Sequence, residues 1–221
     1  MSFDPYEFDR SYAGGQQESL GQYTAKTFLW TVVGLLVTFG VGAVGWATDL
    51  TWIVYRDIPG FQWILLVVTL VLSFTMAMRI ERMSVGTAVA LYLAMAALFG
   101  FTVSLYMYEF QIFSLMLIFL VAAVYFAVLA AFGYVTKADL SGLRPILFSG
   151  LLFLILFYVV SLFIPGLMVA DRMICMIGVA LFLAYTAYDT RRIREFYVYY
   201  SNYPDMLAKA SIFSALQLYL D

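Results

Sequence analysis

The stretch Leu181–Arg194, LFLAYTAYDTRRIR, carries an acid, Asp189, at the end of an apolar run and directly before an arginine cluster. A second apolar run, Ile212–Asp221 (IFSALQLYLD), also ends on an acid. In a soluble protein an acid beside arginines is an ordinary surface feature. Inside a membrane a charged side chain is costly and indicates a functional site. The environment of these two acids therefore decides how the chain is interpreted.

The composition of the chain is that of a membrane protein. Apolar residues make up 64% of the 221 residues and charged residues 12%, with a mean hydropathy of +0.92. Soluble domains have about 45–50% apolar and about 25% charged residues. The net charge of −2 gives no indication of a nucleic-acid partner. Because the chain has no histidine, Ser-His catalysis and the commonest zinc sites are excluded, and we expect neither an enzyme nor a tightly bound cofactor.

Seven apolar runs predict an all-α protein with seven transmembrane helices, since one span needs about 20 apolar residues. Six runs approach this length: Thr27–Thr48, Phe61–Met78, Val85–Tyr106, Ile112–Val135, Ile146–Ile164 and Met173–Tyr188. The seventh begins near Met206 and is still apolar when the sequence stops at Asp221. Either the chain is truncated there, as we expect, or the last helix ends inside the membrane.

The remaining sequence predicts one membrane domain behind a polar tail. Residues 1–22 have little to bury and predict a disordered cytosolic segment, which leaves 23–221 as a single transmembrane domain. Within the first predicted span, Gly40, Gly42 and Gly45 predict the close approach of a neighbouring helix.

The distribution of basic residues predicts the orientation of the chain in the membrane, because lysines and arginines concentrate in cytosolic loops. Only Arg56 and Arg172 fall on the side opposite the amino terminus. The other ten fall on the side of the amino terminus: Arg10, Lys26, Arg79, Arg82, Lys137, Arg144, Arg191, Arg192, Arg194 and Lys209. We therefore expect a cytosolic amino terminus.

Asp221 is predicted to lie deep in the bilayer. If the inner interface is near Lys209, a rise of about 1.5 Å per residue places Asp221 about 18 Å along its helix. An ionised carboxylate facing lipid at that depth costs at least about 2.5–3.5 kcal/mol. We expect Asp221 to be partnered, protonated or beside a water-filled cavity, unless the end of the chain exposes it to water.

Asp189 and Arg79 each allow an ordinary and a functional interpretation. Asp189 forms an interfacial pair with Arg192 three residues later, or it is the deepest charge of its helix and takes part in a site. Arg79 ends the second predicted span, where an arginine snorkels to the interface. Alternatively, Arg79 is the cation that keeps one of the two aspartates ionised.

Two carboxylates that meet between helices form a proton sensor without histidine. At close range they cannot both ionise cheaply, so they share a proton and titrate as a unit. A protonated pair bridges its helices and holds a pore shut, whereas deprotonation separates them and leaves a lining that attracts cations. Asp189 is predicted near the inner interface, however. It reaches Asp221 only if the sixth helix continues past its arginines or if Lys209 lies beyond the interface.

These motifs resemble the Bax inhibitor-1 (transmembrane Bax inhibitor motif) family. The resemblance rests on Tyr188-Asp189-Thr190 with Ile193, on Leu216-Gln-Leu-Tyr-Leu-Asp221, and on the order of the spans. It implies two triangular layers of helices around a central last helix. It also implies a proton-sensitive calcium leak channel of the bacterial inner membrane, gated by the two aspartates, which would contact permeant calcium transiently. The implied latch is Arg79, with Arg82 and Arg192 as alternatives.

Two other classes of function compete with a calcium leak. One is a membrane interaction protein that regulates a membrane protease, or stress and cell-death signalling, through a membrane-protein partner. The sequence contains no binding motif for such a partner. The other is an intramembrane aspartyl protease, which is disfavoured because Leu218-Tyr-Leu stands before Asp221 where Gly-x-Gly is expected.

Overall fold

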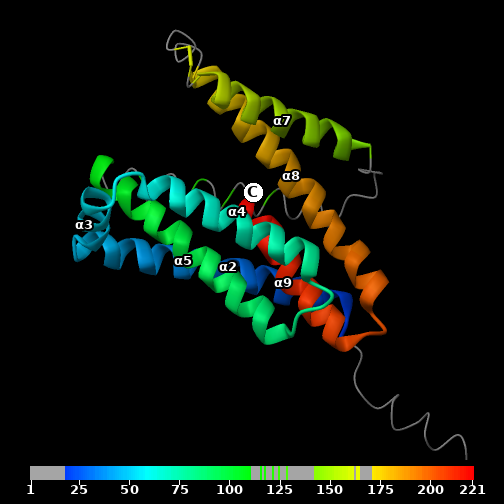
Figure 1. The fold of residues 1–221 in the computed structure, drawn as a ribbon. Coiled ribbons are helices and arrows are strands. Elements are labelled where there is room, and N and C mark those ends of the chain that lie inside the picture. Colours follow the sequence, from blue (N-terminus) through cyan, green and yellow to red (C-terminus); the bar gives the residue numbers. More distant parts are fainter. Residues whose placement is uncertain are drawn as a thin grey trace, which may run out of the picture.

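The computed structural model describes residues 18–110, 142–161, 163–164 and 171–221, with single positions between 111 and 141. Across these residues the regular structure is helical, so the predicted all-α class is confirmed (Figure 1). The predicted span Ile112–Val135 and most of the predicted tail lie outside the described residues. The helices are α2 (Leu20–Ala47), α3 (Leu50–Asp57), α4 (Phe61–Arg79), α5 (Val85–Glu109), α7 (Leu143–Ser161), α8 (Asp171–Tyr200) and α9 (Pro204–Leu220).

Five of these helices, α2, α4, α5, α7 and α8, are long and apolar enough to cross a membrane. Each of them overlaps one of the spans predicted from the sequence. The seventh predicted span corresponds to α9. The prediction of a multi-pass membrane protein is therefore confirmed.

Helix α2 has the residue distribution of a helix packed in lipid. Large apolar side chains face outward, and Leu29, Leu36 and Phe39 are 63%, 65% and 49% exposed. Small and hydroxyl-bearing residues face inward, where they allow helices to approach closely. The buried residues of α2 are Tyr23, Thr24, Thr27, Thr31, Gly34, Thr38, Gly42 and Gly45.

Helices α2 and α5 approach each other through glycine. A Cβ atom added at Gly42 would lie 3.2 Å from the Gly100 carbonyl oxygen, and one added at Gly100 would lie 2.7 Å from the Thr38 carbonyl oxygen. Gly45 lies against Ser104 of α5 in the same way. The predicted close approach at Gly42 and Gly45 is confirmed. At Gly40 it is wrong, because an added Cβ atom would meet no atom of the described residues within 4 Å.

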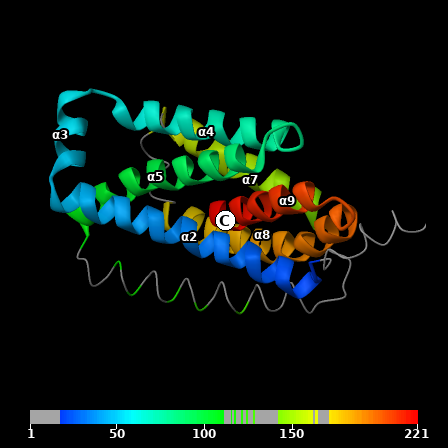
Figure 2. The same ribbon diagram turned by 90° about the horizontal axis from the view of Figure 1, so that it is seen from below.

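Helix α9 lies between α2, α5 and α8 (Figures 1 and 2). Ile212 and Leu216 pack in one core cluster with Met76 and Tyr92, while Leu207 packs in a second cluster around Tyr23. This arrangement agrees with the central last helix that the family resemblance implies. More than half of its residues are buried: Leu207, Lys209, Ala210, Ser211, Ile212, Ser214, Ala215, Leu216 and Leu218.

A short helix occupies a segment that the sequence analysis treats as a connection. The predicted loop Asp49–Gly60 contains α3. Thr51 of α3 is fully buried, and its hydroxyl accepts a hydrogen bond of 2.6 Å from Ser104 on α5. Gly60 then turns the chain into α4 with a φ of +77°, a conformation that suits glycine. A helix of eight residues is too short to give a transmembrane signal, so only its packing identifies it.

The sixth predicted span ends too early. It stops at Tyr188, where the apolar run stops, but α8 continues to Tyr200. Arginine is a good helix former, so the cluster Arg191–Arg194 marks the end of the apolar run without ending the helix. The extension satisfies the first condition under which Asp189 and Asp221 can meet.

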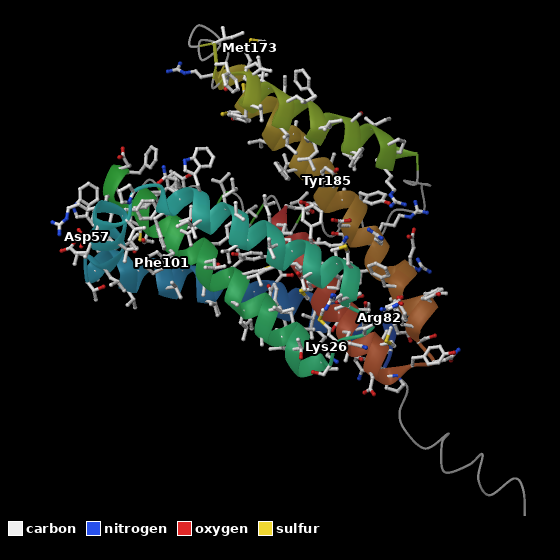
Figure 3. All side chains as sticks on the ribbon, viewed as in Figure 1. Lys26, Asp57, Arg82, Phe101, Met173 and Tyr185 are labelled. Carbon is white, nitrogen blue, oxygen red and sulfur yellow. The ribbon has the colours of Figure 1, made fainter. Side chains whose placement is uncertain are left out.

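Four helix ends are held together at one end of the molecule. Lys209 of α9 donates a hydrogen bond of 3.0 Å to the Glu81 carbonyl oxygen, and Tyr200 of α8 donates one of 3.0 Å to the Glu81 carboxylate. Tyr197 donates one of 2.8 Å to the Glu18 carbonyl oxygen, just before α2. Lys26 and Arg82 lie near this end, whereas Asp57 lies at the opposite end (Figure 3). The cytosolic location of this end stays a prediction.

Replacing Thr38 by valine should destabilise the contact between α2 and α9. The Thr38 hydroxyl lies 2.7 Å from the Tyr219 hydroxyl and 3.0 Å from the Ala96 carbonyl oxygen. Valine keeps the shape but loses these bonds, at a cost of about 0.5–1.5 kcal/mol. Thermal unfolding in detergent measures the loss. Thr102→Val is the control, because the Thr102 hydroxyl donates to Leu98 within its own helix. An equal loss in both variants would contradict the assignment.

Candidate functional site

The structure brings the two predicted aspartates together where α9 reaches the middle of α8 (Figures 1 and 2). Asp189 is 8% exposed. The Oδ2 atom of Asp221 is buried and, among the described residues, has no hydrogen-bond partner. The carboxyl group of Asp221 lies within electrostatic range of the Asp189 carboxylate and beside the Thr186 hydroxyl. A buried acid of α8 and a partly buried acid directly after α9 thus lie together.

Helical spacing places the neighbours of each acid on the same face. Tyr185 stands four residues before Asp189, and Gln217 stands four residues before Asp221. Residues three or four apart on a helix are surface neighbours. Arg192 follows Asp189 by three residues and is the cation that acts on its carboxylate. The local helix geometry therefore assembles an acid, a cation and hydrogen-bonding groups on the inner face of α8.

Arg192 is held by a second contact. Its guanidinium lies over the Phe196 ring, 4.8 Å from the ring centroid. A cation over an aromatic face gains about 0.5–1 kcal/mol at an exposed site. This contact stabilises Arg192 close to Asp189. The latch role of Arg192 stays a prediction.

The other two candidate latches lie elsewhere. Arg79 and Arg82 are exposed, and within the described part of the chain neither forms an ion pair. Met76, one turn before Arg79, packs against Ile212 and Leu216 in the first core cluster. Arg79 is therefore level with the first half of α9, whereas Asp221 follows the last residue of α9. The latch roles of Arg79 and Arg82 also stay predictions.

A cavity of about 410 Å³ opens beside Asp189. It lies where the start of α7, the inner face of α8 and the end of α9 meet, and Tyr185 marks its place in Figure 3. Asp189 is the acid among its lining residues. The lining residues are Arg144, Pro145, Phe148, Tyr185, Tyr188, Asp189, Arg192 and Gln217.

Several of these lining residues are absent from the predicted site. Tyr185 and Gln217 each precede an aspartate by one helical turn, so this spacing was the signal that could have identified them. Arg144 carries no such signal, because it belongs to another helix and is interpreted from the sequence only as a loop cation. Its location beside Asp189 depends on how α7 packs against α8.

The predicted calcium contacts at Asp189 and Asp221 stay predictions. Calcium in proteins takes about 6–8 oxygen ligands. Among the described residues, no three His, Cys, Asp or Glu side chains form a group that could hold a metal ion. The two aspartates alone would supply a small part of that shell.

Apolar spanning helices around a central helix, with an acid pair buried between two of them, define a multi-pass helical membrane protein. The family model described as "Inhibitor of apoptosis-promoting Bax1" matches residues 20–221. The chain belongs to this family, the Bax inhibitor family, and the resemblance seen in the sequence is confirmed.

Bacterial relatives match nearly the whole chain. An uncharacterized protein of Deinococcus radiodurans is 32% identical, covering 93% of this chain and 88% of that protein. The inner membrane protein YbhL of Escherichia coli is 31% identical, covering 91% of this chain and 86% of YbhL. An uncharacterized protein of Chlamydia muridarum is 32% identical, covering 96% of this chain and 90% of that protein. No solved structure matches the chain.

Proposed function

We propose that the protein is a proton-sensitive calcium leak channel, with Asp189 and Asp221 as its gate. The observation that carries the proposal is the meeting of two carboxyl groups from α8 and α9 in a buried position. At low pH the pair holds a proton and joins the two helices. At higher pH both groups ionise, their repulsion separates the helices, and the exposed carboxylates attract calcium.

The surroundings of the pair support a gate between these helices. Arg192 is the cation that acts on the Asp189 carboxylate, and ionisation of Asp221 as well would add a second negative charge between α8 and the end of α9. Such a charge is unfavourable in a closed, buried position and favourable beside a hydrated cation. The proposed channel is not an enzyme and needs no tightly bound cofactor, since calcium is the permeant ion.

The proposed location is the bacterial inner membrane with the amino terminus in the cytosol. The relative YbhL is described as an inner membrane protein, which supports this location. The predicted excess of basic residues on the side of the amino terminus supports the orientation. Calcium would then leak from the outside into the cytosol, down its gradient.

Calcium flux into liposomes tests the proposal directly. The purified chain is reconstituted with a calcium indicator inside, and flux is followed between about pH 6 and about pH 8, where a shared carboxylate proton can titrate. We expect flux above that of protein-free liposomes, and we expect it to rise with pH. Absence of flux at every pH would contradict the channel.

The same preparation tests the competing interaction function. A membrane protein that co-purifies in stoichiometric amount, together with an absence of flux from the isolated chain, would favour an interaction protein. Flux without a partner would favour the channel.

A further inference from the structure

The surface of the cavity beside Asp189 is mainly apolar, but five of its lining residues carry hydrogen-bond donors. Arg144 and Arg192 each carry a guanidinium, and Gln217 carries a side-chain amide. Tyr185 and Tyr188 add two phenolic hydroxyls. Asp189, when ionised, accepts hydrogen bonds but donates none. A cavity of about 410 Å³ falls within the range of about 300–1,000 Å³ typical of ligand sites. This lining matches an anion with several acceptor oxygens.

The charges of the lining also favour an anion. Arg192 acts on Asp189, so these two groups offset each other. Arg144 is exposed and forms no ion pair with any described residue. The lining residues therefore have a net charge of about +1 when Asp189 is ionised, and about +2 when it is protonated, since arginine stays charged. Asp221 does not line the cavity but interacts with Asp189, so the site keeps a positive net charge, and attracts an anion, while the acid pair holds a proton.

The cavity lies against helices that face lipid. Phe148 lines it and is 65% exposed, and Ile146 beside it on α7 is 62% exposed. Large apolar side chains on a spanning helix are exposed to acyl chains. Arg144 stands in the first turn of the same helix, where basic residues that flank a spanning helix are expected beside the lipid headgroups. The lining thus combines cationic and apolar side chains, as an amphiphilic ligand requires.

We propose that this cavity binds the phosphate group of an anionic phospholipid, with Arg144 and Arg192 as its two ligands and the acyl chains along α7. Two guanidiniums can hold phosphate oxygens in paired, charge-assisted hydrogen bonds. Basic pockets between membrane helices are a recognised type of lipid-headgroup site. The proposal concerns binding and goes beyond the channel function, so it is tested without measuring flux.

Retention of lipid by the purified protein tests the site. Native mass spectrometry compares the protein supplied with equal amounts of phosphatidylglycerol and phosphatidylcholine. Both lipids carry a phosphate, but phosphatidylcholine also carries a positive charge that opposes binding to arginines. We expect preferential retention of phosphatidylglycerol, and a roughly tenfold loss of it in Arg144→Gln and in Arg192→Gln, since each removes charge-assisted bonds.

Matched controls separate this site from general basicity. Arg194→Gln removes an exposed arginine of α8 that does not line the cavity, and it should leave lipid retention unchanged. Asp189→Asn removes the one acid of the lining and should increase retention. If a glutamine variant does not fold, lysine replaces it. Lysine keeps the charge but loses the paired geometry, so an intermediate loss is expected.

Three outcomes would overturn the lipid site. The first is equal retention of phosphatidylglycerol in wild type, Arg144→Gln and Arg192→Gln. The second is displacement of the lipid by millimolar inorganic phosphate, which would assign the cavity to free phosphate. The third is equal retention of the two lipids, which would mean that Arg144 is a counter-ion of Asp189 and not a ligand of the lipid phosphate. A protein that retains the lipid but shows no calcium flux would overturn the channel and keep the lipid site.

Discussion

Asp189→Asn and Asp221→Asn should each abolish the pH response of calcium flux. Asparagine is uncharged at every pH and resembles the protonated acid in size, so each variant removes the repulsion that opens the proposed gate. We expect flux near pH 8 to fall roughly tenfold or more, to the low wild-type level near pH 6, since an approximately 1.4 kcal/mol bias changes an equilibrium tenfold. The profile between these values should be flat.

The control for this experiment is Asp57→Asn. Asp57 is exposed on α3, at the end of the molecule opposite Lys26 and Arg82, and pairs with Arg56 at 3.0 Å (Figure 3). An exposed ion pair contributes about 0–1 kcal/mol, so this variant should retain the wild-type flux and pH response. If both site variants also kept the wild-type response, the two aspartates would not be the sensor. If the two aspartate variants retained calcium flux with a normal pH response, the protein would be a channel whose gate lies elsewhere.

Gly100→Ala should strongly destabilise the interface between α2 and α5. The new Cβ atom would lie 2.7 Å from both the Thr38 carbonyl oxygen and the Val41 Cβ atom. One of these neighbours is backbone, so the two helices have to separate. Overpacking of this kind costs about 1–3 kcal/mol. Thermal unfolding of the detergent-solubilised protein should show a clear fall in midpoint.

Gly40→Ala is the matched control, and it should not lower the stability of the protein. Within the part of the chain that the structure describes, a Cβ atom at Gly40 would meet no atom within 4 Å. Alanine in a helix is more favourable than glycine by up to about 1 kcal/mol, so this variant should be neutral or more stable. Equal destabilisation by the two alanines would mean that the close contact at Gly100 does not control stability.

The spanning helices could be predicted from the sequence because one physical property, the hydropathy of a long run, determines them. Long apolar runs define spanning helices because a bilayer has a fixed thickness, and the predicted runs recovered α2, α4, α5, α7 and α8. Helix α3 escaped prediction because eight residues packed through Thr51 give no hydropathy signal. The predicted end of α8 is wrong because hydropathy indicates where a helix leaves the membrane. Hydrogen bonding and packing determine where the helix itself ends.

The two aspartates were identifiable because a buried charge in an apolar run is costly at any position. The contact between the two aspartates could not be predicted from their depths in the bilayer. The position of a residue along its helix gives neither the tilt of that helix nor the extension of α8 beyond its apolar run. The cationic surroundings were less predictable still. Arg79 is conspicuous in the sequence because it ends a predicted span, whereas Arg144 has the sequence position of an ordinary loop arginine. Only the contact of α7 with α8 places Arg144 beside Asp189.

The burial of α9 has a consequence for how the protein is made. Helix α9 follows all other described helices in the chain, and it buries Lys209, Ser211 and Ser214. A translocation machinery would insert such a segment into plain lipid at a disadvantage, because charged and polar residues oppose insertion. The earlier helices, once inserted, offer it a protein-lined cleft instead. The ribosome therefore delivers Asp221 after Asp189, so a chain synthesised only as far as α8 carries one member of the acid pair.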